Sequence, residues 1–210
     1  SQGYVLYLKS GRPHFGVRAN QEFSSVGGPE RIVGRWTHVA GVLTEDKQLR
    51  IYVDGKLAGK ATAAGLLGGN PAEAMQIAVD ESSVVGDYAG PSAFKGAIDE
   101  VRVYHRALGD GEIGRHASPA RAVDIETEGL ALWYSFEDGQ AGDASGHDNN
   151  GTVVGAAVAQ GRIGKGLRFT GRAGSSAAFT VEHFWTKEVP LLARAMVLAD
   201  KALFIAGPPD

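Results

Sequence analysis

The chain has 210 residues, 43% hydrophobic and 21% charged, which is ordinary usage for a globular protein with a buried core. Its formal net charge is -3 and its Lys and Arg residues are scattered, so we expect no basic surface for nucleic acid. The chain has no cysteine, which excludes disulfides and thiolate metal sites, and no apolar run approaches the roughly 20 residues of a membrane helix.

Short alternating runs of apolar and polar residues predict strands along the first quarter of the chain. The runs at residues 4–8 and 14–18 flank a tight turn and read as a pair of strands. Residues 36–43 and 48–53 predict two further strands, and the Asp-Gly pair at 54–55 is a favoured two-residue hairpin turn. This part of the chain is therefore expected to form a meander of antiparallel strands.

The rest of the chain continues the same pattern and contains one helical signal. A short helix is predicted at residues 110–116, with Gly109 or Asp110 as its cap and Glu112 in its first turn. Thirty glycines recur between the apolar runs, as expected for strands joined by tight turns. The fold class predicted is all-β. Further strands are predicted at residues 75–79, 97–104, 130–136, 166–170 and 177–181, with a final hairpin at 191–198 and 202–205.

Three motifs in the first half occur in a specific order. They are WTHVAGV at residues 36–42, LRIYVDG at 49–55 and GAIDEVRVY at 96–104. Together they resemble the C-terminal two-thirds of a LamG-like domain of the concanavalin A-like lectin/glucanase superfamily. This resemblance implies a two-sheet antiparallel β-sandwich, a jelly roll, with one short helix.

Three later motifs resemble the first third of the same family, so the two blocks stand in swapped order. They are GLALWYSFEDG at residues 129–139, DASGHDNNGT at 143–152 and GKGLRFTG at 164–171.

One interpretation is a single circularly permuted sandwich over residues 1–182, with 1–118 as the C-terminal block and 128–182 as the N-terminal block. It requires the strands at 97–104 and 130–136 to be neighbours. The other is the end of one module followed by the start of the next, which would leave long strand edges unpaired. Residues 183–210 depart from the family and predict extra strands or the start of a following β-rich domain.

The polar loop at residues 143–152 is the candidate metal site. It is rich in the oxygen donors that calcium prefers. By resemblance to the family, a structural calcium ion would be held by Asp143, Asn150 and Thr152, with Asp99 or Glu100 facing them. The alternative is that the Asp and Asn side chains only form turns in a polar loop.

The candidate catalytic residues do not form a pattern typical of an enzyme. Strand alternation puts Asp99 on one face with Ala97 and Val101, so this strand does not supply the second carboxylate that a retaining glycosidase needs. No nucleophile-elbow pattern is present. Catalytic residues are therefore predicted to be absent.

The aromatic residues give the candidates for sugar binding. Trp36, His38 and Trp133 lie inside predicted strands, so they are interpreted as core residues whose ring N–H groups bond to the backbone. Sugar rings stack on aromatic faces exposed in loops, and the candidates there are Phe23, Tyr88 and Trp185.

The leading hypothesis is a non-catalytic, lectin-like module of a larger exported bacterial protein. Its partners would be a glycan or a protein ligand and the neighbouring domains of the chain, without nucleic acid and without membrane insertion. The expected location is extracellular, at the cell surface or in the periplasm. The alternatives are a structural or assembly domain that contacts other proteins or domains and, third, a polysaccharide hydrolase or lyase.

Overall fold

The computed structural model describes residues 2–68, 75–80, 85–86, 92–118 and 125–171, with the backbone of strands at 179–180, 195–199 and 202–206. Strands dominate these residues and one short helix is present, so the predicted all-β class is confirmed. Among the described residues, no helix has the length and apolar character needed to cross a membrane.

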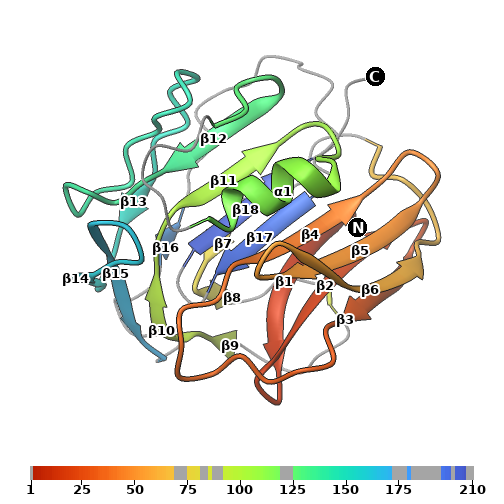
Figure 1. The fold of residues 1–210 in the computed structure, drawn as a ribbon, viewed down its shortest axis with the longest axis horizontal. Coiled ribbons are helices and arrows are strands. Elements are labelled where there is room, and N and C mark those ends of the chain that lie inside the picture. Colours follow the sequence, from red (N-terminus) through yellow and green to blue (C-terminus); the bar gives the residue numbers. More distant parts are fainter. Residues whose placement is uncertain are drawn as a thin grey trace.

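The larger sheet has seven strands in the order β12-β11-β17-β18-β4-β5-β6. Figure 1 shows this sheet with the helix α1 (Asp110–His116) lying across its outer face. The β17–β18 hairpin lies between β11 and β4, and β18 runs parallel to both of these strands. The bounds are Val39–Leu43 (β4), Gln48–Val53 (β5), Lys56–Thr62 (β6), Val101–Tyr104 (β11), Leu130–Tyr134 (β12), Ala195–Ala199 (β17) and Ala202–Ala206 (β18).

Smaller sheets complete the sandwich. The first, in the order β1-β2-β3, is an antiparallel meander with Tyr7 opposite His14 and Phe15 opposite Val26. The others are β10-β15-β14, β13-β16-β7 and the pair β8-β9. The bounds are Gly3–Lys9 (β1), Arg12–Ala19 (β2), Glu22–Gly27 (β3), Gln76–Ile77 (β7), Val79–Asp80 (β8), Ser92–Ala93 (β9), Lys95–Ile98 (β10), Thr152–Val153 (β13), Ala157–Gln160 (β14), Lys165–Thr170 (β15) and Phe179–Thr180 (β16).

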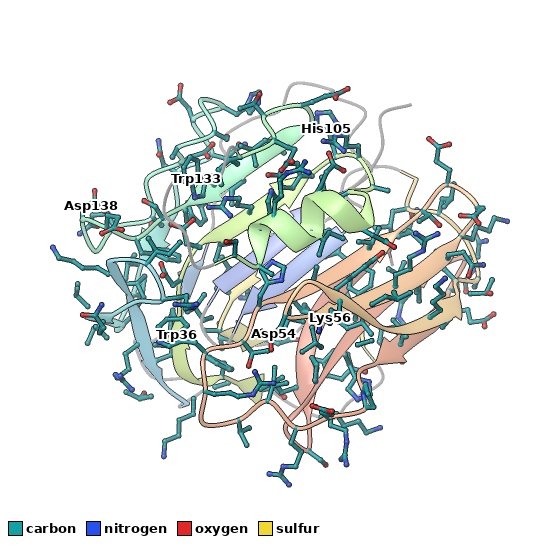
Figure 2. All side chains as sticks on the ribbon, viewed as in Figure 1. Trp36, Asp54, Lys56, His105, Trp133 and Asp138 are labelled. Carbon is teal, nitrogen blue, oxygen red and sulfur yellow. The ribbon has the colours of Figure 1, made fainter. Side chains whose placement is uncertain are left out.

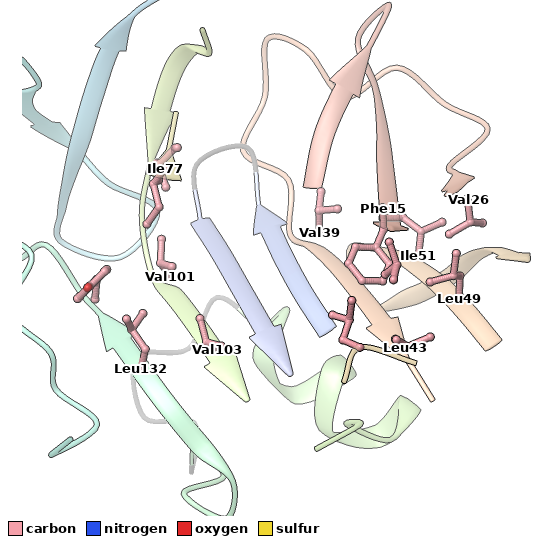
Figure 3. Close-up of a cluster of buried hydrophobic side chains, with 14 of the residues drawn as sticks. Phe15, Val26, Val39, Leu43, Leu49, Ile51, Ile77, Val101, Val103 and Leu132 are labelled. Carbon is pink, nitrogen blue, oxygen red and sulfur yellow. The ribbon is translucent and has the colours of Figure 1, made fainter. Parts of the chain in front are cut away.

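The core lies between the two layers and follows the alternation of the strands. Side chains of β2 and β3 meet those of β4 and β5, as Figure 3 shows for Phe15, Val39 and Ile51. The same cluster of buried residues continues to Val101 of β11 and Leu132 of β12. The second block contributes Leu167 and Phe169 from β15 to the same core. Apolar side chains of both sequence blocks are therefore buried together, and the hydrophobic effect holds the blocks to one another.

The helix covers a second apolar cluster on the outer face of the larger sheet. Ile113 of α1 is fully buried there with Val42, Tyr52 and Tyr104. Gly109 is the N-cap, and its N–H donates to the Glu112 carboxylate at 2.6 Å. The predicted bounds of this helix are confirmed, and the Gly109 cap is one of the two predicted.

Two predicted strands are shorter than their patterns suggested. Residues 36–38 precede β4 instead of belonging to it, so the interpretation of Trp36 and His38 as residues inside a strand is wrong. Between β10 and β11 the strand is interrupted at Asp99 and Glu100, and Glu100 has a φ of 54°. The alternation assumed across residues 97–104 is therefore broken, because a left-handed residue reorients the side chains beyond it.

The two sequence blocks meet where β11 pairs with β12. The pairing is antiparallel, with Val101 opposite Tyr134 and Arg102 opposite Trp133. The neighbouring strands β10 and β15 also join the blocks, with Ile98 opposite Leu167. The pairing expected of a permuted sandwich is present, and the interpretation of residues 1–182 as one permuted domain stays a prediction.

This pairing predicts that the first block does not fold by itself. A chain ending at residue 118 loses Leu132, Tyr134, Leu167 and Phe169 from the core, each worth about 1.5–3 kcal/mol of burial. The sum approaches the whole stability of an ordinary domain, about 5–15 kcal/mol. We expect no cooperative transition for residues 1–118 in urea, followed by near-UV circular dichroism, and a cooperative one for the full chain. Cooperative unfolding of residues 1–118 as a monomer would contradict the shared core.

Candidate functional site

A small polar pocket opens on the outer face of the larger sheet, beside the C-terminal end of α1. Its volume is about 90 Å³. Segments far apart in the sequence form it: residues 36–38 with Asp54, Glu100 with Arg102, residues 116–118, and residues 162–163. Figure 2 labels Trp36 and Asp54, which lie near one another in that view. The pocket is large enough for a few water molecules or one part of a small polar ligand.

An ion pair between Glu100 and Arg102 lies deep in this pocket. The two side chains are 8% and 5% exposed, and their charged groups are in direct contact. The Trp133 indole N–H donates to Glu100 Oε2 at 3.0 Å, and the Arg102 guanidinium lies over the Trp133 ring, 4.9 Å from its centroid. Burial raises the pKa of Glu100, whereas Arg102 and the indole N–H oppose that rise. The sequence analysis predicted that this indole N–H would bond to the backbone. It bonds instead to a carboxylate, so that prediction is wrong.

Two histidines beside this ion pair carry no charge at neutral pH. Burial holds the pKa of His38 well below its usual value and lowers the pKa of His116 to about 4. His116 Nε2 lies 2.6 Å from Glu126 Oε2, so at pH 7 the neutral ring donates its Nε2–H to this carboxylate. Because Glu126 lies just before the second block, which begins at residue 128, this bond ties the start of that block to α1.

Thr37 lines the pocket and carries a buried hydroxyl. The residue is 1% exposed, and within the described part of the chain Thr37 Oγ1 has no hydrogen-bond partner. Leaving a buried hydroxyl unpaired costs about 1–3 kcal/mol, so such groups are uncommon in folded proteins. A ligand hydroxyl that reached Thr37 would satisfy it.

Asp54 fixes the segment that carries Trp36 and Thr37. It lies in the predicted hairpin turn, where Asp54 and Gly55 both have positive φ values, as a type I′ turn requires. Its Oδ1 accepts the His38 backbone N–H at 3.0 Å, and its Oδ2 accepts from Arg35 at 2.8 Å. The aspartate of the hairpin therefore also shapes the wall of the pocket.

Asp99 fixes the opposite wall. It is fully buried, and its Oδ2 accepts the Ile163 backbone N–H at 2.9 Å. The turn is closed by a bond from Gly161 N to Gly164 O at 3.0 Å, and a Cβ at Gly161 would lie 2.7 Å from the Asp99 carboxylate. Desolvation raises the pKa of Asp99 to about 7, against the hydrogen bond from Ile163.

The residues predicted to bind calcium do not form one cluster. Asp143 Oδ1 accepts backbone N–H bonds from Trp133 and Ser145, and its Oδ2 accepts from the Ser145 hydroxyl and the Asn149 backbone N–H, all within 3.0 Å. Asn150 Oδ1 accepts the backbone N–H of Asp143 at 2.8 Å. Both carboxylate oxygens are therefore engaged in holding the loop.

The other predicted ligands point elsewhere. Thr152 is exposed at the start of β13, and Asp99 bonds to Ile163. Glu100 bonds to Arg102 and to the Trp133 indole, whereas Asp143 bonds to the Trp133 backbone. Among the described residues, no three His, Asp or Glu side chains are grouped to hold a metal. In the loop, Asn149 Oδ1 is buried without a partner, yet calcium needs six to eight oxygens. This arrangement does not fit calcium, and the ion stays a prediction from the resemblance.

Of the aromatic residues predicted to stack on sugars, one lies in the described chain. Phe23 is half-buried on the outer face of β3, where its ring covers Gly16 and Arg18 lies 5.6 Å from the ring centroid. The ring therefore already packs against β2. Tyr88 and Trp185 lie outside the described residues.

Most residues of the pocket were not singled out from the sequence. Thr37, Arg102, His116 and Arg162 carry ordinary surface or strand patterns, and no spacing marks them as a group. One sequence signal could have pointed to Arg162. The glycines at 161 and 164 indicate a tight turn, and the two residues at the centre of such a turn are available for contact with another segment. Their proximity comes from strand pairing, which joins residues more than 60 positions apart.

A two-layer, mostly antiparallel β-sandwich with one short helix on its outer face is the architecture of a jelly-roll domain. A family model described as the concanavalin A-like lectin/glucanases superfamily, of the laminin G type, matches residues 1–114. The chain therefore belongs to this superfamily, which confirms the resemblance and indicates a carbohydrate-binding or structural module. No curated protein and no solved structure matched the chain. The match covers the first block, so the swapped order of the blocks stays a prediction.

The buried Asp99 predicts a pH-dependent stability difference. An unfolded Asp loses its proton near pH 3.8 and the folded Asp99 near pH 7, so the stability it contributes is complete below pH 3.8 and is lost as the pH rises to 7. Asp99→Asn stays neutral, and its amide oxygen can still accept from Ile163. The unfolding free energy of the variant, minus that of the wild type, should rise by roughly 4 kcal/mol at most between pH 4 and pH 8.

Urea unfolding at several pH values measures this difference. The exposed Asp148→Asn is the matched control, because it removes a carboxylate that bonds to no described residue, at a position where Asn tolerates the positive φ. Its difference from the wild type should stay flat with pH. A flat or falling difference for Asp99→Asn would contradict the role assigned to Asp99.

The hydrogen bonds of Asp143 predict a loss of stability that needs no metal. Asp143→Ala removes four bonds to a half-buried carboxylate and should lower the unfolding free energy by about 2–4 kcal/mol, equally in EDTA and in calcium chloride. Thermal melts in both buffers measure this, with Asp148→Asn again as control. A melting temperature that falls on chelation in the wild type and not in Asp143→Ala would instead support the calcium predicted from the sequence.

Proposed function

We propose that this protein is a non-catalytic, lectin-like module that binds carbohydrate in the pocket beside α1. The observation that carries the proposal is the unpaired hydroxyl of Thr37 in a polar pocket with an indole, Trp36, on its wall. Sugars present hydroxyl groups that both donate and accept, together with an apolar ring face that packs on aromatic rings. A pocket of this size suits part of one sugar residue at the end or side of a glycan. We further propose that the module belongs to a larger exported protein.

The charged groups of the pocket support binding rather than hydrolysis. Retaining glycosidases place two carboxyl groups about 5 Å apart, one as acid and one as nucleophile. Here Glu100 is held by Arg102 and the Trp133 N–H, and Asp54 is held by Arg35 and the His38 backbone. Neither carboxylate is available to attack a sugar or to exchange a proton without breaking a buried or turn-forming contact.

Thr37→Val tests the proposal, because it keeps the shape of the side chain and removes the hydroxyl. The variant should melt at the wild-type temperature or above it, since a buried unpaired hydroxyl is lost. Its affinity for the glycan selected on an array should fall about three- to tenfold, the value of one hydrogen bond. Isothermal titration measures the affinity, and Thr37→Ser, which restores a hydroxyl, should recover it.

Phe23→Ala tests whether the glycan binds in the pocket or on the outer face of β1, β2 and β3. It should leave the affinity unchanged, whereas a loss confined to Phe23→Ala would move the site to the face predicted from the sequence. Binding to no glycan on the array would overturn the proposal and leave the structural or assembly module.

A further inference from the structure

The acidic groups that line the pocket are already neutralised by arginines. Glu100 pairs with Arg102 inside the pocket, and Asp54 pairs with Arg35 at its edge, with 2.8 Å between Asp54 Oδ2 and the guanidinium. His38 and His116 are uncharged at neutral pH, because burial lowers the pKa of both. One more charged side chain lines the pocket, and it is Arg162.

Arg162 offers a positive charge that no described residue neutralises. Its side chain is exposed, and within the described residues it has no ion pair and no side-chain hydrogen bond. Its backbone, in contrast, is fixed, because the 161–164 turn is closed on itself and held by the buried Asp99. A fixed backbone lowers the entropy lost when the side chain is ordered by a ligand. The pocket therefore has one positioned cation at its mouth and an unpaired hydroxyl, that of Thr37, in its wall.

We infer that the sugar held by this pocket is a uronate, whose carboxylate pairs with Arg162 while one of its hydroxyls bonds to Thr37. The inference rests on the proposed function and names its ligand class. A guanidinium matches a planar carboxylate with two parallel hydrogen bonds. A carboxylate in place of the hydroxymethyl group adds a single oxygen, whereas a sulfate ester adds a sulfur and its oxygens. In a pocket of about 90 Å³ the smaller anion is favoured.

The test compares oligosaccharides of galacturonate, glucuronate and mannuronate with their carboxyl-reduced, neutral forms and with a sulfated oligosaccharide. Isothermal titration with the full chain at low ionic strength should show at least one uronate binding roughly five- to tenfold more tightly than its reduced form. The preference should shrink as salt is added, since it depends on an exposed charge. Arg162→Gln should abolish the preference and keep the melting temperature.

Arg168→Gln is the matched control, because Arg168 is an exposed arginine of β15, the strand that follows the same turn, and does not line the pocket. It should keep the preference for the uronate. Equal binding of acidic and neutral forms, or binding of the sulfated probe alone, would overturn the uronate inference and leave carbohydrate binding standing. Binding of none of these probes, nor of any glycan on the array, would overturn the proposed function as well.

Discussion

The Glu100–Arg102 ion pair lies beneath the Trp133 ring where β11 meets β12, and the site depends on this buried contact. Charges removed from water are tolerated only when they are paired and hydrogen-bonded, and both conditions are met here by residues on two strands. Arg102 belongs to the first sequence block and Trp133, its partner in register, to the second. Burial of the pair therefore requires both blocks to be in place.

The same contact explains the unusual backbone at the end of β10. Glu100 is left-handed, a conformation that costs a non-glycine residue about 1 kcal/mol or more. At this interruption the two adjacent carboxylates point to different partners. Glu100 pairs with Arg102, and Asp99 accepts a hydrogen bond from the 161–164 turn. Both walls of the pocket are thus held by acidic residues, Asp54 on one side and Asp99 on the other, and its interior by the ion pair.

Local signals in the sequence predicted the elements well where the cause of the structure is local. The helix at Asp110–His116 has its cap and first-turn glutamate within four residues, and the Asp54–Gly55 turn needs only two positive φ values. The predictions were wrong where residues distant in the sequence determine the local conformation. Trp36 and His38 continue the apolar pattern of β4, yet Asp54 holds their segment outside the strand. The Asp143 loop has the composition of a calcium site, yet its carboxylate is engaged by the loop itself and by Trp133.

The sequence by itself determined the all-β class, the jelly-roll family and the short helix, because periodicity, turn residues and capping act over a few neighbouring positions. Only the tertiary structure decided where the pocket lies and which side chains line it. The Glu100–Arg102 pair comes from one segment of the chain, and Thr37, His116 and Arg162 come from three others, so no spacing in the chain records their proximity. They meet because β11 pairs with β12 and β10 pairs with β15. Charged and polar groups buried by these pairings are stable only when they are paired or hydrogen-bonded, which favours the contacts seen there.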